Sequence, residues 1–279
     1  MLEETHGNVE MSNRAKYARY MYRGRSGYIV DPSSPKTTQK PVAIGHTALV
    51  APWSDPEAHL HKNAEEYYFL LQGELRVLIA ETLVSLKPKE ILMIRPQVPH
   101  AIVGGEGLVE HVGIRAPGYQ DKQHVGDIPK ELPPMSDERE RELRRGWGCR
   151  IPLEVSRNQN CWLIGIGTAK FQSLHLVFAF LDFPTAETAN AGIGTRHRPH
   201  LHQTSWEYYA VLKGTKTLQI ENELVEVNAG EILEVPPMVC HALHSRQAPY
   251  EGFTLRVPID LYDKIECPAS SVFSLERRL

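Results

Sequence analysis

The sequence has little cysteine and no long apolar run. Its four cysteines, in a chain of 279 residues, are Cys149, Cys161, Cys240 and Cys267. They form no CxxC pair, a pattern typical of a reducing compartment in which disulfides are rare. No apolar stretch approaches the roughly 20 residues that span a bilayer, and the first residues lack the basic start and apolar segment of a signal peptide. We therefore expect a soluble cytoplasmic protein with no membrane partner.

The charge is balanced, which argues against nucleic acid as a partner. The chain has 31 basic and 34 acidic residues, a net charge of -3 and a pI of about 6.5. It shows neither a basic patch nor a helix-turn-helix pattern, so we expect no nucleic-acid partner. Its 42% apolar and 23% charged residues are typical of a globular protein, and its length allows two domains.

An internal repeat is the strongest feature of the sequence. HLHKNAEEYYFLLQG begins at His59, and HLHQTSWEYYAVLKG begins 141 residues later at His200. The same offset relates EILMIRPQVPHA, which begins at Glu90, to EILEVPPMVCHA, which begins at Glu231. One offset over about sixty residues indicates a duplicated domain.

Each copy reads as a series of short strands. Apolar or alternating runs, divided by Gly, Pro and Asn, predict an all-β antiparallel sandwich or barrel. The predicted strands cover residues 67–71, 75–80, 83–86 and 91–94 in the first copy and 208–212, 217–220, 224–227 and 232–235 in the second.

The repeat also predicts the domain boundaries. We expect an N-terminal arm at 1–35, an N-terminal barrel at 36–117, a proline-rich connector with a short helix at 118–150, a C-terminal barrel at 151–262 and a tail at 263–279. The tyrosine-containing arm is expected to pack against a barrel or a neighbouring subunit. A homo-oligomer would form through this arm or through the barrel edges.

Two sets of four residues predict metal sites. Residues i and i+2 of a strand point to one face, so the two histidines of each HxH pair project together. A glutamate and a third histidine at repeated offsets complete each set. Glu65 competes with Glu66 for the first set, but only Glu66 aligns with a glutamate in the second copy. The predicted ligands are His59, His61, Glu66 and His100, and then His200, His202, Glu207 and His241.

The pattern HxHxxxxE(x)6G, followed by PxxxH, resembles the two motifs of the cupin superfamily. In overall plan the chain resembles bicupins such as oxalate decarboxylase and quercetin dioxygenase. The resemblance implies two tandem double-stranded β-helix (jelly-roll) barrels with one divalent transition metal each. Fe, Mn, Ni, Cu, Co and Zn all suit imidazole and carboxylate ligands. The arginine that oxalate decarboxylase-like proteins carry three residues before the first histidine is replaced by Pro56 or His197.

Differences between the copies suggest where chemistry takes place. Arg198 shares the strand face of His200, and His244 follows the last ligand by three residues. Arg198 would favour an anionic substrate, or it forms a rim salt bridge. His244 would act as an acid or base, or it lies on the surface. Glu66 or Glu207 would double as proton acceptor.

We therefore expect a metal-dependent oxidoreductase of dioxygenase type that acts on a small oxygenated or anionic organic molecule, mainly at the C-terminal site. A redox-neutral decarboxylase, isomerase or hydrolase and a non-catalytic small-molecule binder are the alternatives.

Overall fold

The computed structural model divides into two compact units, which we describe separately. The described residues are 17–22, 26–31, 40–54, 57–80, 82–118, 121–127, 136, 138, 141, 148–153, 162–166, 169, 171–191, 198–260 and 262–267. The N-terminal unit comprises residues 24–155, and the C-terminal unit comprises residues 1–23 and 156–279. The residues predicted as one N-terminal arm are thus divided between the units.

The N-terminal unit is a nine-stranded sheet in the order β10-β7-β5-β8-β3-β2, extended by β4, β6 and β9. All its strand pairs are antiparallel. The strands are β2 Gly27–Val30, β3 Ala43–Val50, β4 Glu57–His61, β5 Glu65–Ile79, β6 Thr82–Leu86, β7 Glu90–Ile94, β8 His100–Ala116, β9 Lys122–Asp127 and β10 Gly148–Pro152.

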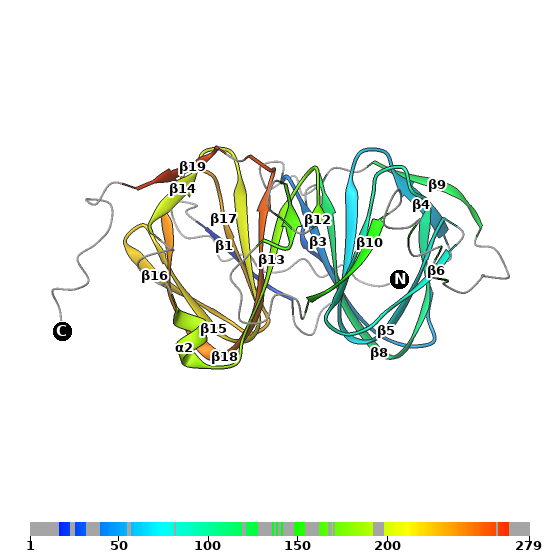
Figure 1. Ribbon diagram of the computed structural model, residues 1–279, viewed down its shortest axis with the longest axis horizontal. Helices are drawn as coiled ribbons and strands as arrows, with labels where there is room; N and C mark the ends of the chain where they lie inside the picture. The colour runs from blue at the N-terminus through cyan, green and yellow to red at the C-terminus, as the bar shows by residue number, and fades with distance from the viewer. Residues whose placement is uncertain are drawn as a thin grey trace. The chain divides into compact units, whose positions relative to one another are not determined.

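The C-terminal unit repeats this plan in the order β1-β17-β15-β18-β13-β11-β12, with β14, β16 and β19 attached. Its elements are β1 Ala18–Met21, β11 Ile164–Gly165, β12 Phe171–Gln172, β13 Val177–Phe183, α2 Ala186–Asn190, β14 His200–His202, β15 Trp206–Ile220, β16 Glu223–Asn228, β17 Glu231–Val235, β18 His241–Val257 and β19 Lys264–Glu266. Strand β1, drawn in blue in Figure 1, pairs with β17 among the yellow and orange strands of this unit.

The fold is all-β with a jelly-roll arrangement in each unit, as the sequence predicts. One prediction was wrong in detail in both copies: the strands predicted at 67–71 and 75–80 are one continuous strand, β5, and those predicted at 208–212 and 217–220 are likewise one strand, β15. Gly73 and Gly214 stand at register shifts within β5 and β15 rather than in turns. A Cβ atom on either glycine would lie 2.4 Å from a backbone oxygen of the neighbouring strand, so only glycine fits.

These bulges change which residues face the interior. In β15, Tyr209 and Val211 belong to the buried core before the bulge, and Leu218 and Ile220 belong to the same core after it. The inward positions therefore change from odd to even numbers along one strand. In β5 the inward positions change from even to odd numbers, from Tyr68 and Leu70 to Leu75, Val77 and Ile79.

A disulfide joins Cys240 to Cys267 in the C-terminal unit. The expectation of unpaired cysteines was therefore wrong for this pair, whose members are 27 residues apart and close only in the fold. Cys149 is buried and is not part of a disulfide among the described residues, whereas Cys161 and most of the predicted connector helix lie outside them.

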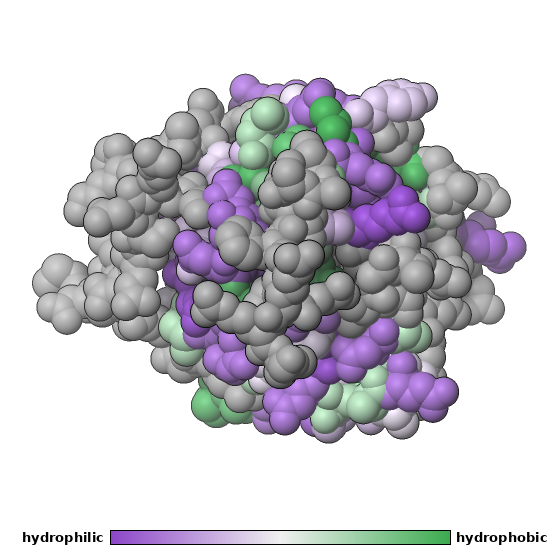
Figure 2. All heavy atoms as spheres, turned by 90° about the vertical axis from the view of Figure 1, so that its left-hand side faces the viewer, coloured by the Kyte–Doolittle hydropathy of each residue, from purple (hydrophilic) through white to green (hydrophobic). Residues whose placement is uncertain are grey.

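The surface of the C-terminal unit is mixed. On the face that Figure 2 presents, the described side chains are mainly hydrophilic, with small hydrophobic patches between them. Within the described residues, no helix is long and apolar enough to cross a membrane.

Candidate metal centres

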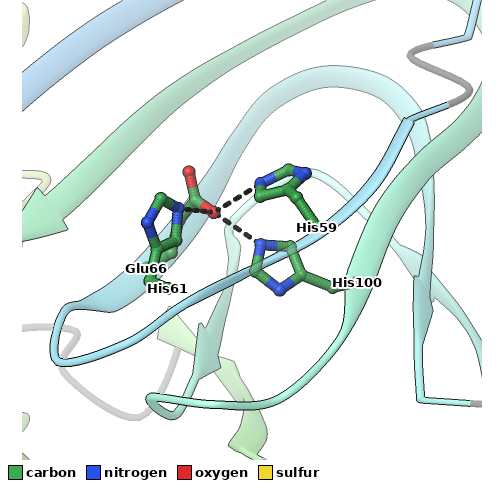
Figure 3. Close-up of side chains that lie close together, drawn as sticks. All are labelled: His59, His61, Glu66 and His100. Atoms are coloured by element: carbon green, nitrogen blue, oxygen red, sulfur yellow. Dashed lines mark hydrogen bonds and ion pairs between the residues drawn. The ribbon is translucent and has the colours of Figure 1, made fainter. Parts of the chain in front are cut away.

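The first predicted ligand set comes together inside the N-terminal unit. β4 carries His59 and His61 on one face, β5 carries Glu66, and β8 begins with His100, which pairs with His59 across the ladder. One candidate ligand atom from each side chain lies within 4.8 Å of those of the others. Figure 3 shows the three imidazoles arranged around the Glu66 carboxylate.

One oxygen of the Glu66 carboxylate lies close to a ring nitrogen of each of the three histidines. Its Oε2 atom lies 2.6 Å from Nε2 of His100, 3.3 Å from Nε2 of His61 and 3.6 Å from Nε2 of His59. All three histidines therefore direct the same ring nitrogen toward one point.

The second set repeats the arrangement in the C-terminal unit. β14 carries His200 and His202, β15 carries Glu207, and His241 begins β18 opposite His200. Their ligand atoms also lie within 4.8 Å of one another. Oε2 of Glu207 is 2.8 Å from Nε2 of His241.

Backbone carbonyls fix the orientation of four of these rings. Nδ1 of His59 lies 3.2 Å from the Glu57 carbonyl oxygen, and Nδ1 of His200 lies 2.8 Å from that of Arg198. His100 and His241 contact the carbonyl oxygens of residues 98 and 239 in the same way. A carbonyl only accepts, so each Nδ1 donates its N–H, and Nε2 is the nitrogen that can bind an ion once it is deprotonated.

The comparisons with known proteins agree with this geometry. Residues 191–249 match the family model described as a cupin domain. Salicylate 1,2-dioxygenase from Pseudaminobacter salicylatoxidans superposes with a TM-score of 0.59 at 11% identity over 84% of this chain and 76% of its own. Both units of this chain have the cupin fold. The chain is a bicupin in architecture.

Two further solved structures share the architecture. A mutant of Bacillus subtilis oxalate decarboxylase OxdC gives a TM-score of 0.54 at 13% identity and covers 95% of this bicupin and 80% of its own chain. Protein Ylba from E. coli gives a TM-score of 0.58 at 10% identity, and the superposition covers 92% of this chain and 96% of Ylba. No curated protein matches the sequence. At such identities the likeness shows the fold alone.

The residues of both centres suit a transition metal. Nε2 of His61 and Nε2 of His202 are buried and form no well-aligned hydrogen bond, although the nearest carboxylate oxygens lie at 3.3 and 3.7 Å; a bound ion would satisfy both nitrogens. Three imidazoles and one carboxylate are a donor set that Mn, Fe, Co, Ni, Cu and Zn accept. In this bicupin His59, His61, Glu66 and His100 would hold one ion, and His200, His202, Glu207 and His241 the other.

Ionisation states favour metal binding too. Burial raises the pKa of Glu66, but the imidazoles of His100, His59 and His61 outweigh this and hold it well below its usual value. His202 and His241 do the same for the pKa of Glu207. Burial, followed by the charge of His241, lowers the pKa of His200 to about 3. The centres thus present ionised carboxylates and, at His200, a neutral imidazole.

Sequence reasoning missed two supporting carboxylates. Oδ1 of Asp121 lies 2.8 Å from Nδ1 of His61, and Oδ1 of Asp263 lies 2.9 Å from Nδ1 of His202. Such carboxylates orient ligand histidines and raise their basicity. The two aspartates are 142 residues apart instead of 141, so a search for aspartates at nearly the repeat offset would have found them.

Three residues weighed in the sequence lie away from the centres. Glu65 is buried and accepts a hydrogen bond from the Tyr67 hydroxyl at 2.7 Å, so Glu66 is the residue that joins the centre. Arg198 is exposed and pairs with Glu266 at 3.7 Å, which corresponds to the rim salt bridge of the two interpretations. His244 is also exposed, because its position on β18 faces away from the core that contains Leu243. The geometry brings neither Arg198 nor His244 to the metal centre.

Equivalent tyrosines lie beside the two centres, and His111 is present only in the N-terminal unit. In the C-terminal unit the Tyr209 hydroxyl donates a hydrogen bond to Oε2 of Glu207. In the N-terminal unit Tyr68 lies near His100, at 6.5 Å between ring centroids, and near His111, at 5.8 Å. Glu207 is also more buried than Glu66, with 6% of its side chain exposed against 15%.

Proposed function

We propose that this bicupin is a metal-dependent oxidoreductase that acts on a small oxygenated or anionic organic molecule by a dioxygenase-type reaction. The observation that carries the proposal is the pair of buried three-histidine, one-glutamate centres, each with an orphaned imidazole nitrogen. A bound Fe, Mn or Cu ion would polarise substrate oxygens and supply redox chemistry. Four protein ligands leave at least one position open in a five- or six-coordinate ion.

The C-terminal centre is our candidate for the reaction site. Arg198 and His244 no longer support this choice, but the deeper burial of Glu207 does, and the Tyr209 hydroxyl donates a hydrogen bond to that carboxylate. Burial and the adjacent Glu207 carboxylate raise the pKa of Tyr209 well above its usual value. The phenol therefore keeps its proton, holds Glu207 in one orientation and leaves that carboxylate to accept a proton from substrate.

The solved structures with the same fold support a small-acid substrate. One of them is a salicylate 1,2-dioxygenase, which was also crystallised with gentisate, and another is an oxalate decarboxylase. Since oxalate decarboxylase covers 95% of this chain, a redox-neutral decarboxylase is the second candidate. Turnover without dioxygen would favour it. A cytoplasmic location stays a prediction from the sequence, and the Cys240–Cys267 disulfide is unusual for that compartment.

Dioxygen uptake tests the proposal. Protein loaded with Fe, Mn or Cu would be assayed with salicylate, gentisate and oxalate. We expect Glu207→Ala to reduce turnover by about a hundredfold or more, since it removes a ligand and a base, and Glu66→Ala to reduce it about threefold at most. Equal losses from both variants would contradict a dominant C-terminal centre. Turnover without dioxygen consumption would contradict the oxidative reaction.

A further inference from the structure

Two buried basic side chains face each other inside the C-terminal unit, and burial together with Arg246 lowers the pKa of Lys216 well below its usual value. Lys216 on β15 is directly opposite Arg246 on β18 in the strand register. Lys216 is 2% exposed and Arg246 is 5% exposed. Like charges at directly opposed positions destabilise a sheet, and burial strengthens their repulsion.

Neither cation forms an ion pair within the described residues. Nζ of Lys216 lies over the Tyr209 ring, 3.9 Å from its centroid. The Arg246 guanidinium lies 4.9 Å from the ring centroid of Phe183 and donates one hydrogen bond from Nη1 to the Ala189 carbonyl oxygen. Nε of Arg246 is buried without a partner. Ring faces attract cations, but they replace only part of the hydration that these groups lose on burial.

The N-terminal unit shows that neither the fold nor the metal ligands require this pair. Its equivalent positions on β5 and β8 are Leu75 and Gly105, which also face each other in the register. Leu75 belongs to an ordinary apolar core. Both units nevertheless bring together the same four ligand types. The two cations are therefore a specific feature of the C-terminal interior.

The pair is connected to the metal centre by one side chain. Tyr209 has Lys216 above its ring, and its hydroxyl donates to Glu207. The surrounding core contains Leu218, Leu243 and Phe183. A ligand held here would meet cations at one side and apolar walls elsewhere, which favours an organic anion over an inorganic one.

We propose that Lys216 and Arg246 form a carboxylate-binding subsite for a small organic acid in the C-terminal unit. A carboxylate supplies the ion-pair partner that both cations lack, and it can accept hydrogen bonds from Nζ of Lys216 and Nε of Arg246. The assignment of this acid as the substrate of the Glu207 centre rests on the proposed function. The binding itself does not.

Calorimetric titration without dioxygen tests the subsite. The probes are three acids, each with its uncharged amide: acetate with acetamide, lactate with lactamide, and salicylate with salicylamide. We expect at least one acid to bind the metal-loaded protein ten times or more tightly than its amide. Lys216→Met and Arg246→Met should each weaken that acid about tenfold and leave the amide unchanged. Lys213→Met is the matched control, because Lys213 is exposed on the same strand.

Thermal unfolding of ligand-free protein is the second readout. Lys216→Met removes one member of a repelling pair, so its unfolding midpoint should equal or exceed that of the wild type. The acid should then raise the midpoint of the wild type more than that of the variant. A structural lysine would give the opposite result: a lower midpoint in Lys216→Met and unchanged acid binding.

The outcomes separate this inference from the proposed function. If no acid binds more tightly than its amide, or if both methionine variants bind the acid like the wild type, the subsite is wrong even where dioxygen is consumed. If the acid binds through Lys216 but no dioxygen is consumed, the subsite stands and the oxidative function fails. Tight binding of sulfate in place of every acid would also overturn the organic-acid assignment.

Discussion

His111 is a buried imidazole that the metal centres do not use. Its ring stacks on Trp53 at 6.3 Å between centroids, and its Nδ1 atom has no hydrogen-bond partner. Burial, followed by the charge of His46, lowers its pKa to about 4 from the ordinary value of 6.5. The folded protein therefore binds fewer protons here than the unfolded chain between these two pH values. The contribution of His111 to the free energy of unfolding is fully present above the pKa that this histidine has in the unfolded chain, and it is lost as the pH falls toward 4.

We expect this residue to make the metal-free protein sensitive to acid. Between pH 7.5 and pH 5, His111 should reduce the free energy of unfolding by about 2 kcal/mol. His111→Phe keeps a flat ring against Trp53 and removes the titration. Urea unfolding of both proteins at the two pH values measures the difference. An equal loss in wild type and variant would show that His111 is not the responsible group.

At the same scale, the sequence predicted the ligands but not the interior cations. Alternation from Glu207 along an uninterrupted strand places Lys216 on the outer face. The bulge at Gly214 reverses the alternation and turns Lys216 inward. In the sequence, the only sign of such a register shift is a glycine, and a glycine is equally typical of a turn. The ligands were predictable because they precede the bulges or follow a turn at a repeated offset.

Strands β9 and β19 are the elements that complete the centres, and no pattern in the sequence indicated strands there. β9 pairs with β4 and β19 pairs with β14, so each covers the strand that carries an HxH pair. An aspartate directly precedes each covering strand, Asp121 before β9 and Asp263 before β19. The Cys240–Cys267 disulfide further joins the end of β19 to the residue before His241.

The aspartates make these strands part of the metal sites. Asp263 contacts Nδ1 of His202 with one oxygen and accepts the Ser205 backbone N–H at 2.9 Å with the other. We expect Asp263→Asn to weaken metal binding at the C-terminal centre about 10- to 100-fold, because the histidine loses an anionic partner. Metal titration by calorimetry, with the N-terminal centre removed by Glu66→Ala, measures the change.

Asp260→Asn is the control for this variant. Asp260 is nearby and bonds to the Tyr262 backbone N–H, but it contacts no ligand histidine. Its metal affinity should equal that of the Glu66→Ala parent. If Asp263→Asn also binds metal like the parent, Asp263 only supports the backbone turn at Ser205.

At the scale of the molecule, the duplication has preserved the ligands of both centres while their surroundings have diverged. Lys216 and Arg246 correspond to Leu75 and Gly105, and Gly252 stands where the first copy has His111. The C-terminal interior thus has two basic side chains where the N-terminal interior has a leucine and a glycine. A centre that had lost its function would have no physical reason to keep buried imidazoles with unpaired nitrogens, since these cost stability without a bound ion.

Both centres should therefore hold metal, one ion each. Elemental analysis of protein purified without added metal should give about two ions per chain. Glu66→Ala and Glu207→Ala should each give about one ion, because each ligand set lies within a separate compact unit. Redox-active Fe, Mn or Cu would support the oxidative reaction, and zinc would favour the redox-neutral alternative. Loss of both ions from either single variant would show that the two centres are coupled, and a wild-type value near one would show that one ligand set is structural.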